Sequence, residues 1–165
     1  MPSQPSELTS LLTRLAASGV EFVLVGGLAA VAQGAPITTF DVDVVHARTP
    51  ENVDALLAFL ESVGARHRGR PGGDPLPPSR EALLGPGHSL LMTDLGPLDV
   101  LGAIEHGLAF DDLLSDSIEI QLEGAAIHVL NLATIVKHKR ASTHPKDQQA
   151  LPVLEEALRQ LNDDG

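Results

Sequence analysis

The sequence contains no cysteine, no tryptophan and no tyrosine, and its four phenylalanines are its only aromatic hydrophobic residues. Without cysteine the chain has no disulfide bonds and no thiolate metal sites, which is typical of proteins from a reducing compartment. With so few aromatic rings, a core must consist mainly of Leu, Val, Ile and Ala. Because 43 % of the 165 residues are apolar, the composition predicts one folded domain over residues 1–165.

Long hydrophobic runs are also missing. The longest run, FVLVGGLAAVA, has eleven residues with two glycines inside it, which is too short to cross a bilayer. The first ten residues, MPSQPSELTS, lack the basic and apolar regions of a signal peptide. We therefore expect a cytoplasmic protein without a membrane partner.

Positive charge is scarce, because 11 Lys and Arg face 22 Asp and Glu and give a net charge of −11. Such a charge disfavours non-specific binding to nucleic acid, so we expect no strong nucleic-acid partner. Seven of the basic residues gather in two segments, ARHRGR and KHKRASTHPK. These segments are either solvated loops or the two sides of a site for an anion such as a triphosphate.

Helical and strand patterns alternate along the chain, which predicts an α/β fold with a mixed sheet flanked by helices. Thr49 and Asn131 have the chemistry of helix N-caps. The Gly- and Pro-rich segment 69–87 predicts a flexible loop, with one short element at SREALL. We expect helices at 6–18, 28–34, 50–63, 111–117, 132–140 and 153–161, and strands at 22–25, 38–46, 89–93, 98–101 and, as a hairpin turning near Gly124, 118–130.

Two aspartates, Asp41 and Asp43, interrupt the apolar strand TTFDVDVV. In a strand, residues two apart share a face, so both carboxylates point the same way while the valines point into the core. Carboxylates so close together repel one another unless a cation compensates their charge. Asp99, in the similar strand PLDVLG, adds a third carboxylate if the two strands are neighbours. Oxygen ligands of this kind favour Mg²⁺ or Mn²⁺, and three acids on two strands can hold two ions for phosphoryl transfer.

The diglycine Gly26-Gly27 follows an apolar strand and precedes a short helix. Glycines there leave backbone N–H groups accessible, so that a phosphate can approach without interference from a Cβ atom. A glycine pair alone is more often simple turn geometry. The order strand, Gly-Gly, helix, strand with Asp-x-Asp is much more specific.

The segment VGGLAAVAQGAPITTFDVDVV resembles the signature of the DNA polymerase β-type nucleotidyltransferase superfamily. The later segment VLNLATIVKHKRASTHPKDQQALPVLEEAL is similar to the C-terminal part of minimal nucleotidyltransferases and of AbiEii-like toxin nucleotidyltransferases. The resemblance covers residues 20 to 160 except for 65–90. It implies the polymerase β-like nucleotidyltransferase fold and the transfer of a nucleoside monophosphate from an NTP substrate to an acceptor hydroxyl. The toxin-like subgroup would also imply a toxin–antitoxin system.

The resemblance assigns roles to five residues of the first signature. Gly26 and Gly27 would bind the phosphates of the nucleotide. Asp41, Asp43 and Asp99 would be the catalytic acids and the ligands of two Mg²⁺ or Mn²⁺ ions, and Asp99 would also help to activate the acceptor hydroxyl.

In the second signature, Lys137 matches a helix lysine that could neutralise triphosphate charge, with a solvated surface lysine as the alternative. Lys146 and Asp147 match a Lys-Asp pair, and Asp147 is expected to contribute to nucleotide binding.

Two positions depart from the family pattern, since Ile37 and His144 stand where many relatives have arginine. Arginine can bind a phosphate in a bidentate manner and His cannot. The differences therefore predict weaker nucleotide binding, unless an arginine of the segment ARHRGR substitutes.

Three functions remain open from the sequence. The first is an Mg²⁺-dependent nucleotidyltransferase whose acceptor is an RNA, a protein or a small molecule. The alternative is a non-catalytic binding or regulatory module of the same fold that acts with a partner protein. A metal-dependent phosphohydrolase could use the same acids, but the diglycine suits a nucleotide better than a water. The small size of the chain also suggests a partner chain or a homodimer.

Overall fold

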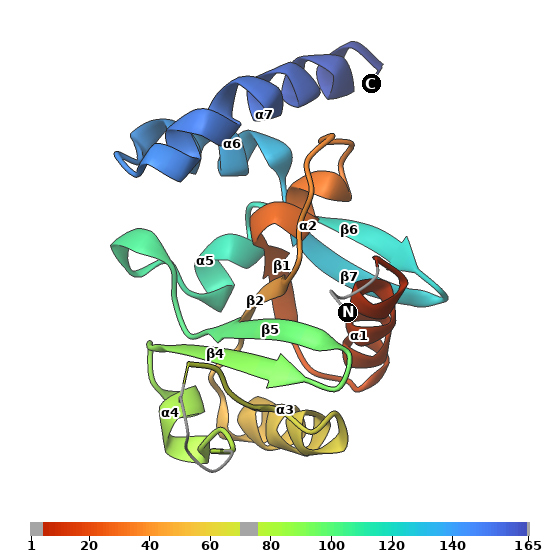
Figure 1. Cartoon of the computed structure of the whole chain (residues 1–165), viewed down its shortest axis with the longest axis vertical. Helices are drawn as coiled ribbons and strands as arrows, with labels where there is room; N and C mark the ends of the chain where they lie inside the picture. Colours follow the sequence, from red (N-terminus) through yellow and green to blue (C-terminus); the bar gives the residue numbers. More distant parts are fainter. Residues whose placement is uncertain (1–4, 70–75, 165) are drawn as a thin grey trace.

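A single mixed sheet of seven strands organises the protein (Figure 1), whose computed structural model describes residues 5–69 and 76–164. Helices flank this sheet, so the predicted α/β architecture with a mixed sheet is confirmed. The strand order is β3-β4-β5-β2-β1-β7-β6. The strands are β1 (Phe22–Val25), β2 (Val42–His46), β3 (Arg66–His67), β4 (His88–Thr93), β5 (Gly96–Leu101), β6 (Ser117–Leu122) and β7 (Ala125–Leu130).

Two parallel pairs at the centre of the sheet join segments that are far apart in the sequence. Strand β2 runs parallel to β5, and β1 runs parallel to β7, whereas β1 and β2 are antiparallel to each other. The pairs β4–β5 and β6–β7 are the two predicted hairpins. This arrangement places the strand of Asp43 directly beside the strand of Asp99.

The helices begin at the residues whose chemistry favours a helix start. The Thr49 hydroxyl accepts a hydrogen bond from the Asn52 N–H (3.2 Å), and the Asn131 side chain accepts one from the Thr134 N–H (2.8 Å), so both predicted N-caps are confirmed. The helices are α1 (Pro5–Ala17), α2 (Gly26–Val31), α3 (Pro50–Ser62), α4 (Arg80–Leu84), α5 (Phe110–Leu114), α6 (Leu132–Ala141) and α7 (Pro145–Asp164), with a 3₁₀ turn at Glu105–Gly107.

Figure 1 shows α6 and α7 together at one end of the molecule and α3 and α4 at the other. None of the helices in the described parts of the chain combines the length and the apolar character that a membrane crossing requires.

The core is mainly aliphatic, as the composition predicts. Val42, Val44, Leu98 and Val100 of the central strands are completely buried, and α1 contacts β2, β5 and β7. Because side chains alternate across a strand, the aspartates at the intervening positions point to the opposite face of the sheet. The apolar alternation therefore fixes the register that brings the acids together.

Several boundaries differ from the sequence-based expectations. Strand β2 begins at Val42 and not at residue 38, because β1 pairs only as far as Asp43 before the chain turns into α2. Helix α2 includes both glycines of the diglycine. Helix α7 begins at Pro145 and not at residue 153, so Pro152 lies within it.

Other differences lie near the segment 69–87. The short edge strand β3 was not expected from the sequence, and the predicted element at SREALL is confirmed as α4. Residues 70–75 of the predicted flexible loop lie outside the described residues. His46, the last residue of β2, is completely buried, and its Nε2 atom lies 2.7 Å from the Leu83 carbonyl oxygen.

A buried glutamine ties α2 to the start of α6. The Gln33 side-chain amide donates to the Ala29 and Leu130 carbonyl oxygens at 3.0 and 2.9 Å. Its Oε1 accepts a hydrogen bond from the Leu132 N–H at 2.7 Å. These bonds fix the diglycine turn relative to the C-terminal helices, and the candidate site lies between the two.

Candidate active site

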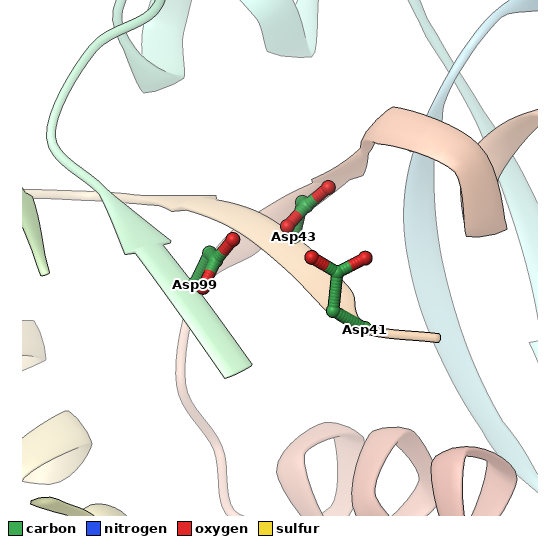
Figure 2. A group of neighbouring side chains, drawn as sticks. All are labelled: Asp41, Asp43 and Asp99. Carbon is green, nitrogen blue, oxygen red and sulfur yellow. The ribbon is translucent and has the colours of Figure 1, made fainter. Parts of the chain in front are cut away.

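Three carboxylates, those of Asp41, Asp43 and Asp99, form an acidic cluster on the sheet (Figure 2). Asp43 and Asp99 are direct partners in the parallel pair β2–β5, and Asp41 immediately precedes β2. One carboxylate oxygen from each residue lies within 4.8 Å of the other two. The convergence expected from the sequence is therefore present.

The electrostatics of the acidic cluster are unfavourable for three bare negative charges. Burial, together with the nearby charge of Asp41, raises the pKa of Asp43 to about 8. Burial and the charge of Asp99 also raise the pKa of Asp41. The Asp43 Oδ1 atom is buried and has no hydrogen-bond partner among the described residues. Closely spaced hard oxygens and an unpaired buried oxygen atom fit a divalent cation such as Mg²⁺ or Mn²⁺.

Among the described residues, Arg68 is the basic side chain that forms an ion pair with the acidic cluster. The Arg68 Nη1 atom lies 2.7 Å from the Asp99 Oδ1 atom, and it donates a hydrogen bond to the Leu91 carbonyl oxygen at 2.8 Å. Its positive charge opposes the rise in the pKa of both Asp41 and Asp43. Arg68 thus compensates part of the charge of the acidic cluster.

The first position of the diglycine requires glycine, because Asp43 lies very close to it. Gly26 has a φ of +73°, and a Cβ atom on it would lie 2.3 Å from the Asp43 Oδ2 atom. A Cβ atom on Gly27 would lie 3.0 Å from the Thr39 Oγ1 atom. Gly26 therefore makes room for a carboxylate of the acidic cluster, a role that the sequence did not reveal.

A cavity of about 420 Å³, called here the site cavity, opens beside Gly26 and Asp43. Its remaining walls come from the end of β5 and the turn after it, from the end of β7, and from α6 and the start of α7. Its lining is Val25, Gly26, Asp43, Leu101, Ile104, Glu105, His106, Leu130, Ile135, His138, Lys139, Ala141, Ser142, Thr143 and Asp147.

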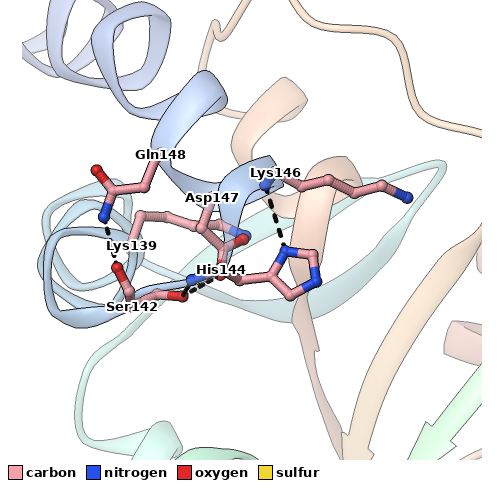
Figure 3. A network of polar contacts seen from close by, with 6 residues as sticks. All are labelled: Lys139, Ser142, His144, Lys146, Asp147 and Gln148. Carbon is pink, nitrogen blue, oxygen red and sulfur yellow. Dashed lines mark hydrogen bonds and ion pairs between the residues drawn. The ribbon is translucent and has the colours of Figure 1, made fainter.

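A polar network joins α6 to α7 at the wall of the site cavity (Figure 3). The Lys139 Nζ atom donates to the Asp147 Oδ1 atom at 2.7 Å, and the Ser142 hydroxyl donates to the Asp147 Oδ2 atom at 2.6 Å. The bonds from Lys139 and Ser142 hold the pKa of Asp147 below its usual value. The ammonium group of Lys139 is therefore anchored beside the site cavity by an ionised partner.

No protein-family model matches the chain, and no curated protein matches its sequence. Several solved structures match its fold, and three of them do so over nearly its whole length. The lincosamide antibiotic adenylyltransferase LnuA, in its lincomycin-bound form, matches with a TM-score of 0.61 and 14 % identity, over 95 % of this chain and 99 % of that one.

The antibiotic-resistance factor ANT(2'')-Ia matches with a TM-score of 0.56 and 13 % identity, over 98 % of this chain and 92 % of that one. TM1012 of Thermotoga maritima, a protein assigned as a nucleotidyltransferase, matches with a TM-score of 0.52 and 18 % identity, over 97 % of this chain and 92 % of that one. The chain has the nucleotidyltransferase fold. The AbiEii-like subgroup remains a prediction, because no structure of that subgroup is among these three.

Within this nucleotidyltransferase fold, the predicted site residues fall into two groups. Gly26, Asp43 and Asp147 line the site cavity, and Asp41 and Asp99 lie close to Asp43 in the acidic cluster. Gly27 follows Gly26 in the chain. Lys137 is exposed and is not among the described residues that line the site cavity. Lys146 is also exposed.

Lys139 lines the site cavity, whereas the sequence had pointed to Lys137. The buried residues of α6 are Leu132, Ile135 and Val136, and Lys139 continues this stripe at helical spacing. Lys137 lies between these positions and on the exposed side of the helix. The periodicity of the helix was therefore the signal that favoured Lys139.

The two positions without the family arginine have other structural roles. Ile37 is partly buried and packs against the core. His144 precedes α7, and its Nδ1 atom accepts a hydrogen bond from the Lys146 N–H at 3.2 Å, which satisfies one of the free N–H groups at the helix start (Figure 3).

Proposed function

We propose that this protein is a metal-dependent nucleotidyltransferase that moves a nucleoside monophosphate from an NTP to an acceptor hydroxyl. The observation that carries the proposal is the acidic cluster on neighbouring strands beside Gly26 and the site cavity. In the reaction, the acceptor oxygen forms a bond to the α-phosphorus, the bond from that phosphorus to the β-phosphate oxygen breaks, and pyrophosphate leaves. The hydroxyl proton passes to a base.

Asp41, Asp43 and Asp99 would hold two Mg²⁺ or Mn²⁺ ions. Bound ions would align the α-phosphate and neutralise the charge that develops on the leaving pyrophosphate. Asp99 comes from a different strand than the other two acids, and it would help to activate the acceptor hydroxyl.

The NTP would occupy the site cavity. Gly26 and Gly27 would let its phosphates approach the backbone closely, and Lys139 would contribute positive charge from the opposite wall. Asp147 would act by fixing the Lys139 ammonium group at 2.7 Å. We retain Lys137 as a competing candidate for the phosphate-binding lysine, and the two lysines can be compared directly by substitution.

A small molecule is the acceptor class to test first. One structural neighbour is a lincosamide adenylyltransferase with lincomycin bound, and another is an antibiotic-resistance factor. The match to LnuA extends over 95 % of this chain and 99 % of that one. RNA and protein acceptors, and a toxin–antitoxin role with a partner protein, remain to be tested against this class.

The alternative is a non-catalytic module of the same fold that binds nucleotide and acts with a partner. Ile37 in the core and His144 at a helix start favour it, because neither position offers a guanidinium to a phosphate. The buried acids oppose it, since a binding module has no need for three converging carboxylates whose charge is costly.

The deciding experiment is transfer of label from an NTP. The purified protein is incubated with Mg²⁺ and each NTP labelled at the α-phosphate. Parallel reactions contain lincosamides, other hydroxyl-bearing antibiotics, or a lysate depleted of nucleotides. The variant Asp41→Asn/Asp43→Asn tests the acidic cluster. The matched control Asp163→Asn/Asp164→Asn removes two exposed acids from the end of α7.

We expect labelled acceptor with the wild type and the control but none with the Asp41→Asn/Asp43→Asn variant. Label in a small molecule, an RNA or a protein identifies the acceptor class. Nucleotide binding without transfer or hydrolysis favours the non-catalytic module. Release of labelled nucleotide to water favours a phosphohydrolase, and the absence of NTP binding refutes the proposal.

A further inference from the structure

Arg68 follows the edge strand β3 and lies two strands away from Asp99. Its backbone N–H donates to the Leu90 carbonyl oxygen at 2.9 Å, and Leu90 is the direct partner of Asp99 in the pair β4–β5. The three residues form one row across the sheet. Because neighbouring strands are about 4.8 Å apart, the row spans about 10 Å, and only a long side chain can cross it.

The guanidinium group of Arg68 makes two contacts close to Asp99. Its Nη1 atom donates to the Leu91 carbonyl oxygen at 2.8 Å and lies 2.7 Å from the Asp99 Oδ1 atom. The second contact is ionic, because its geometry is not that of a hydrogen bond and the buried Oδ1 atom has no hydrogen-bond partner among the residues that the structure describes. The two side chains are only 28 % and 14 % exposed, so solvent screens the pair weakly.

Asp99 keeps a second oxygen for the acidic cluster. Figure 2 shows one oxygen of its carboxylate turned toward Asp43 and the other turned away. A carboxylate that is held at one oxygen by an anchored cation presents the other oxygen in a fixed direction. The Leu91 carbonyl anchors that cation to the sheet itself, in the strand next to Asp99.

We propose that Arg68 is a positioning residue, which orients Asp99 so that the acidic cluster is preorganised for its divalent cations. This inference rests on the proposed function, because it takes the acidic cluster to be a metal site. Partners that orient metal ligands typically contribute 10- to 100-fold to metal affinity or activity. Arg68 would act through Asp99 and would not itself touch the metal.

Arg68 could act as a positive charge near the acidic cluster or as a partner that orients Asp99. These two roles predict opposite effects of its removal on the affinity for a divalent cation. If the guanidinium served only as a positive charge near the acidic cluster, its removal would tighten the binding of a divalent cation. If it orients Asp99, its removal weakens that binding. The direction of the change in affinity therefore distinguishes the two roles.

The test is Mn²⁺ binding to the intact chain, measured by titration calorimetry and by the spin resonance of free Mn²⁺. The variants are Arg68→Met, which keeps much of the aliphatic stem, Arg68→Ala and Arg68→Lys. Arg66→Met is the matched control, because Arg66 lies two residues earlier, in β3, and contacts Asp94 and the Gly64 carbonyl oxygen instead. Folding of each variant is checked by circular dichroism.

We expect Mn²⁺ to bind about tenfold more weakly to Arg68→Met and Arg68→Ala, with a smaller loss in Arg68→Lys. Arg66→Met should bind like the wild type. Added methylguanidinium should restore much of the affinity of Arg68→Ala, an effect that general loss of structure would not give. The transfer reaction should lose kcat, while the KM for NTP changes less than about threefold.

Unchanged or tighter Mn²⁺ binding in Arg68→Met overturns the inference and leaves the proposed function intact. An equal loss in Arg66→Met overturns it as well, since the effect would then be general. If the wild type itself binds no Mn²⁺, the metal-dependent function fails and this inference fails with it.

Discussion

At the scale of single residues, the site depends on a close contact between a glycine and an acid. Asp43 is held on β2 in a position that a Cβ atom on Gly26 would overlap, at 2.3 Å from its Oδ2 atom. The positive φ of Gly26 (+73°) adds a second requirement for glycine. The first glycine of Val-Gly-Gly is thus explained by the position of a carboxylate that lies further along the chain.

The substitution Gly26→Ala should therefore affect the metal site and the stability together. The left-handed backbone conformation costs about 1–2 kcal/mol for alanine, and the Asp43 carboxylate must also move away from the new Cβ atom. We expect Mn²⁺ affinity to fall at least about tenfold, as measured by titration calorimetry, with a lower free energy of unfolding in urea.

Gly19→Ala is the matched control, because Gly19 has a similar φ of +83° but no atom of the described part of the chain lies within 4 Å of an added Cβ atom. It should lose stability through its backbone alone and keep the Mn²⁺ affinity of the wild type. Equal Mn²⁺ affinities in all three proteins would show that Gly26 is not needed for the position of Asp43.

At the scale of secondary-structure elements, the contact of α6 with α7 determines which lysine faces the site cavity. Helix α6 buries Leu132, Ile135 and Val136 and ends near the turn into α7. Lys139 lies on that inner side and pairs with Asp147 in the first turn of α7. The ion pair therefore joins the two helices and directs a positive charge toward the site cavity.

Replacing Lys139 by methionine should weaken NTP binding about five- to tenfold, which corresponds to roughly 1–1.4 kcal/mol. The loss is expected because the ammonium group is fixed beside the site cavity by Asp147. Fluorescence titration with a labelled NTP analogue measures the affinity.

Lys137→Met changes an exposed lysine of the same helix and should alter the affinity less than twofold. The opposite order of effects would support the sequence-based assignment of Lys137 and contradict the role of Lys139. A thermal melt of each variant separates loss of binding from loss of the α6–α7 contact.

At the scale of the whole molecule, the acidic cluster makes the stability of the fold depend on pH. The pKa of Asp43 in the folded protein is raised from 3.8 to about 8, so the folded chain binds more protons than the unfolded chain between these values. Stability is then highest near or below the lower value and falls as the pH rises toward the upper one. Asp41 and Asp43 interact, so the titration belongs to the pair.

We expect Asp43→Asn to be more stable than the wild type at pH 8, by about 1–3 kcal/mol, because it removes the cost of the buried charge. The difference should shrink toward zero as the pH is lowered to about 4. Urea denaturation in the presence of EDTA at several pH values gives the free energy of unfolding without bound metal.

The exposed substitution Asp163→Asn serves as control and should follow the wild type at every pH. If the stability difference between Asp43→Asn and the wild type does not change with pH, the buried charge of Asp43 does not lower the stability of the fold.

The sequence by itself determined the local parts of this protein. Alternating apolar residues predicted the faces of β2 and β5, and cap residues predicted where α3 and α6 begin. The spacing of Asp41 and Asp43 placed both acids on one side of the chain, and the apolar neighbours of Asp99 predicted a third carboxylate on a strand. These features depend on periodicity and on residues close in sequence, which a single chain displays directly.

Only the tertiary structure decided which distant groups meet. The strand order brought β5 beside β2 and confirmed the acidic cluster, which the sequence could predict only on condition that the strands were neighbours. The structure alone revealed that Arg68 reaches Asp99 across β4, that Gly26 adjoins Asp43, and that Lys139 rather than Lys137 lines the site cavity. Contacts between elements depend on how they pack in three dimensions, and local sequence patterns do not specify that packing.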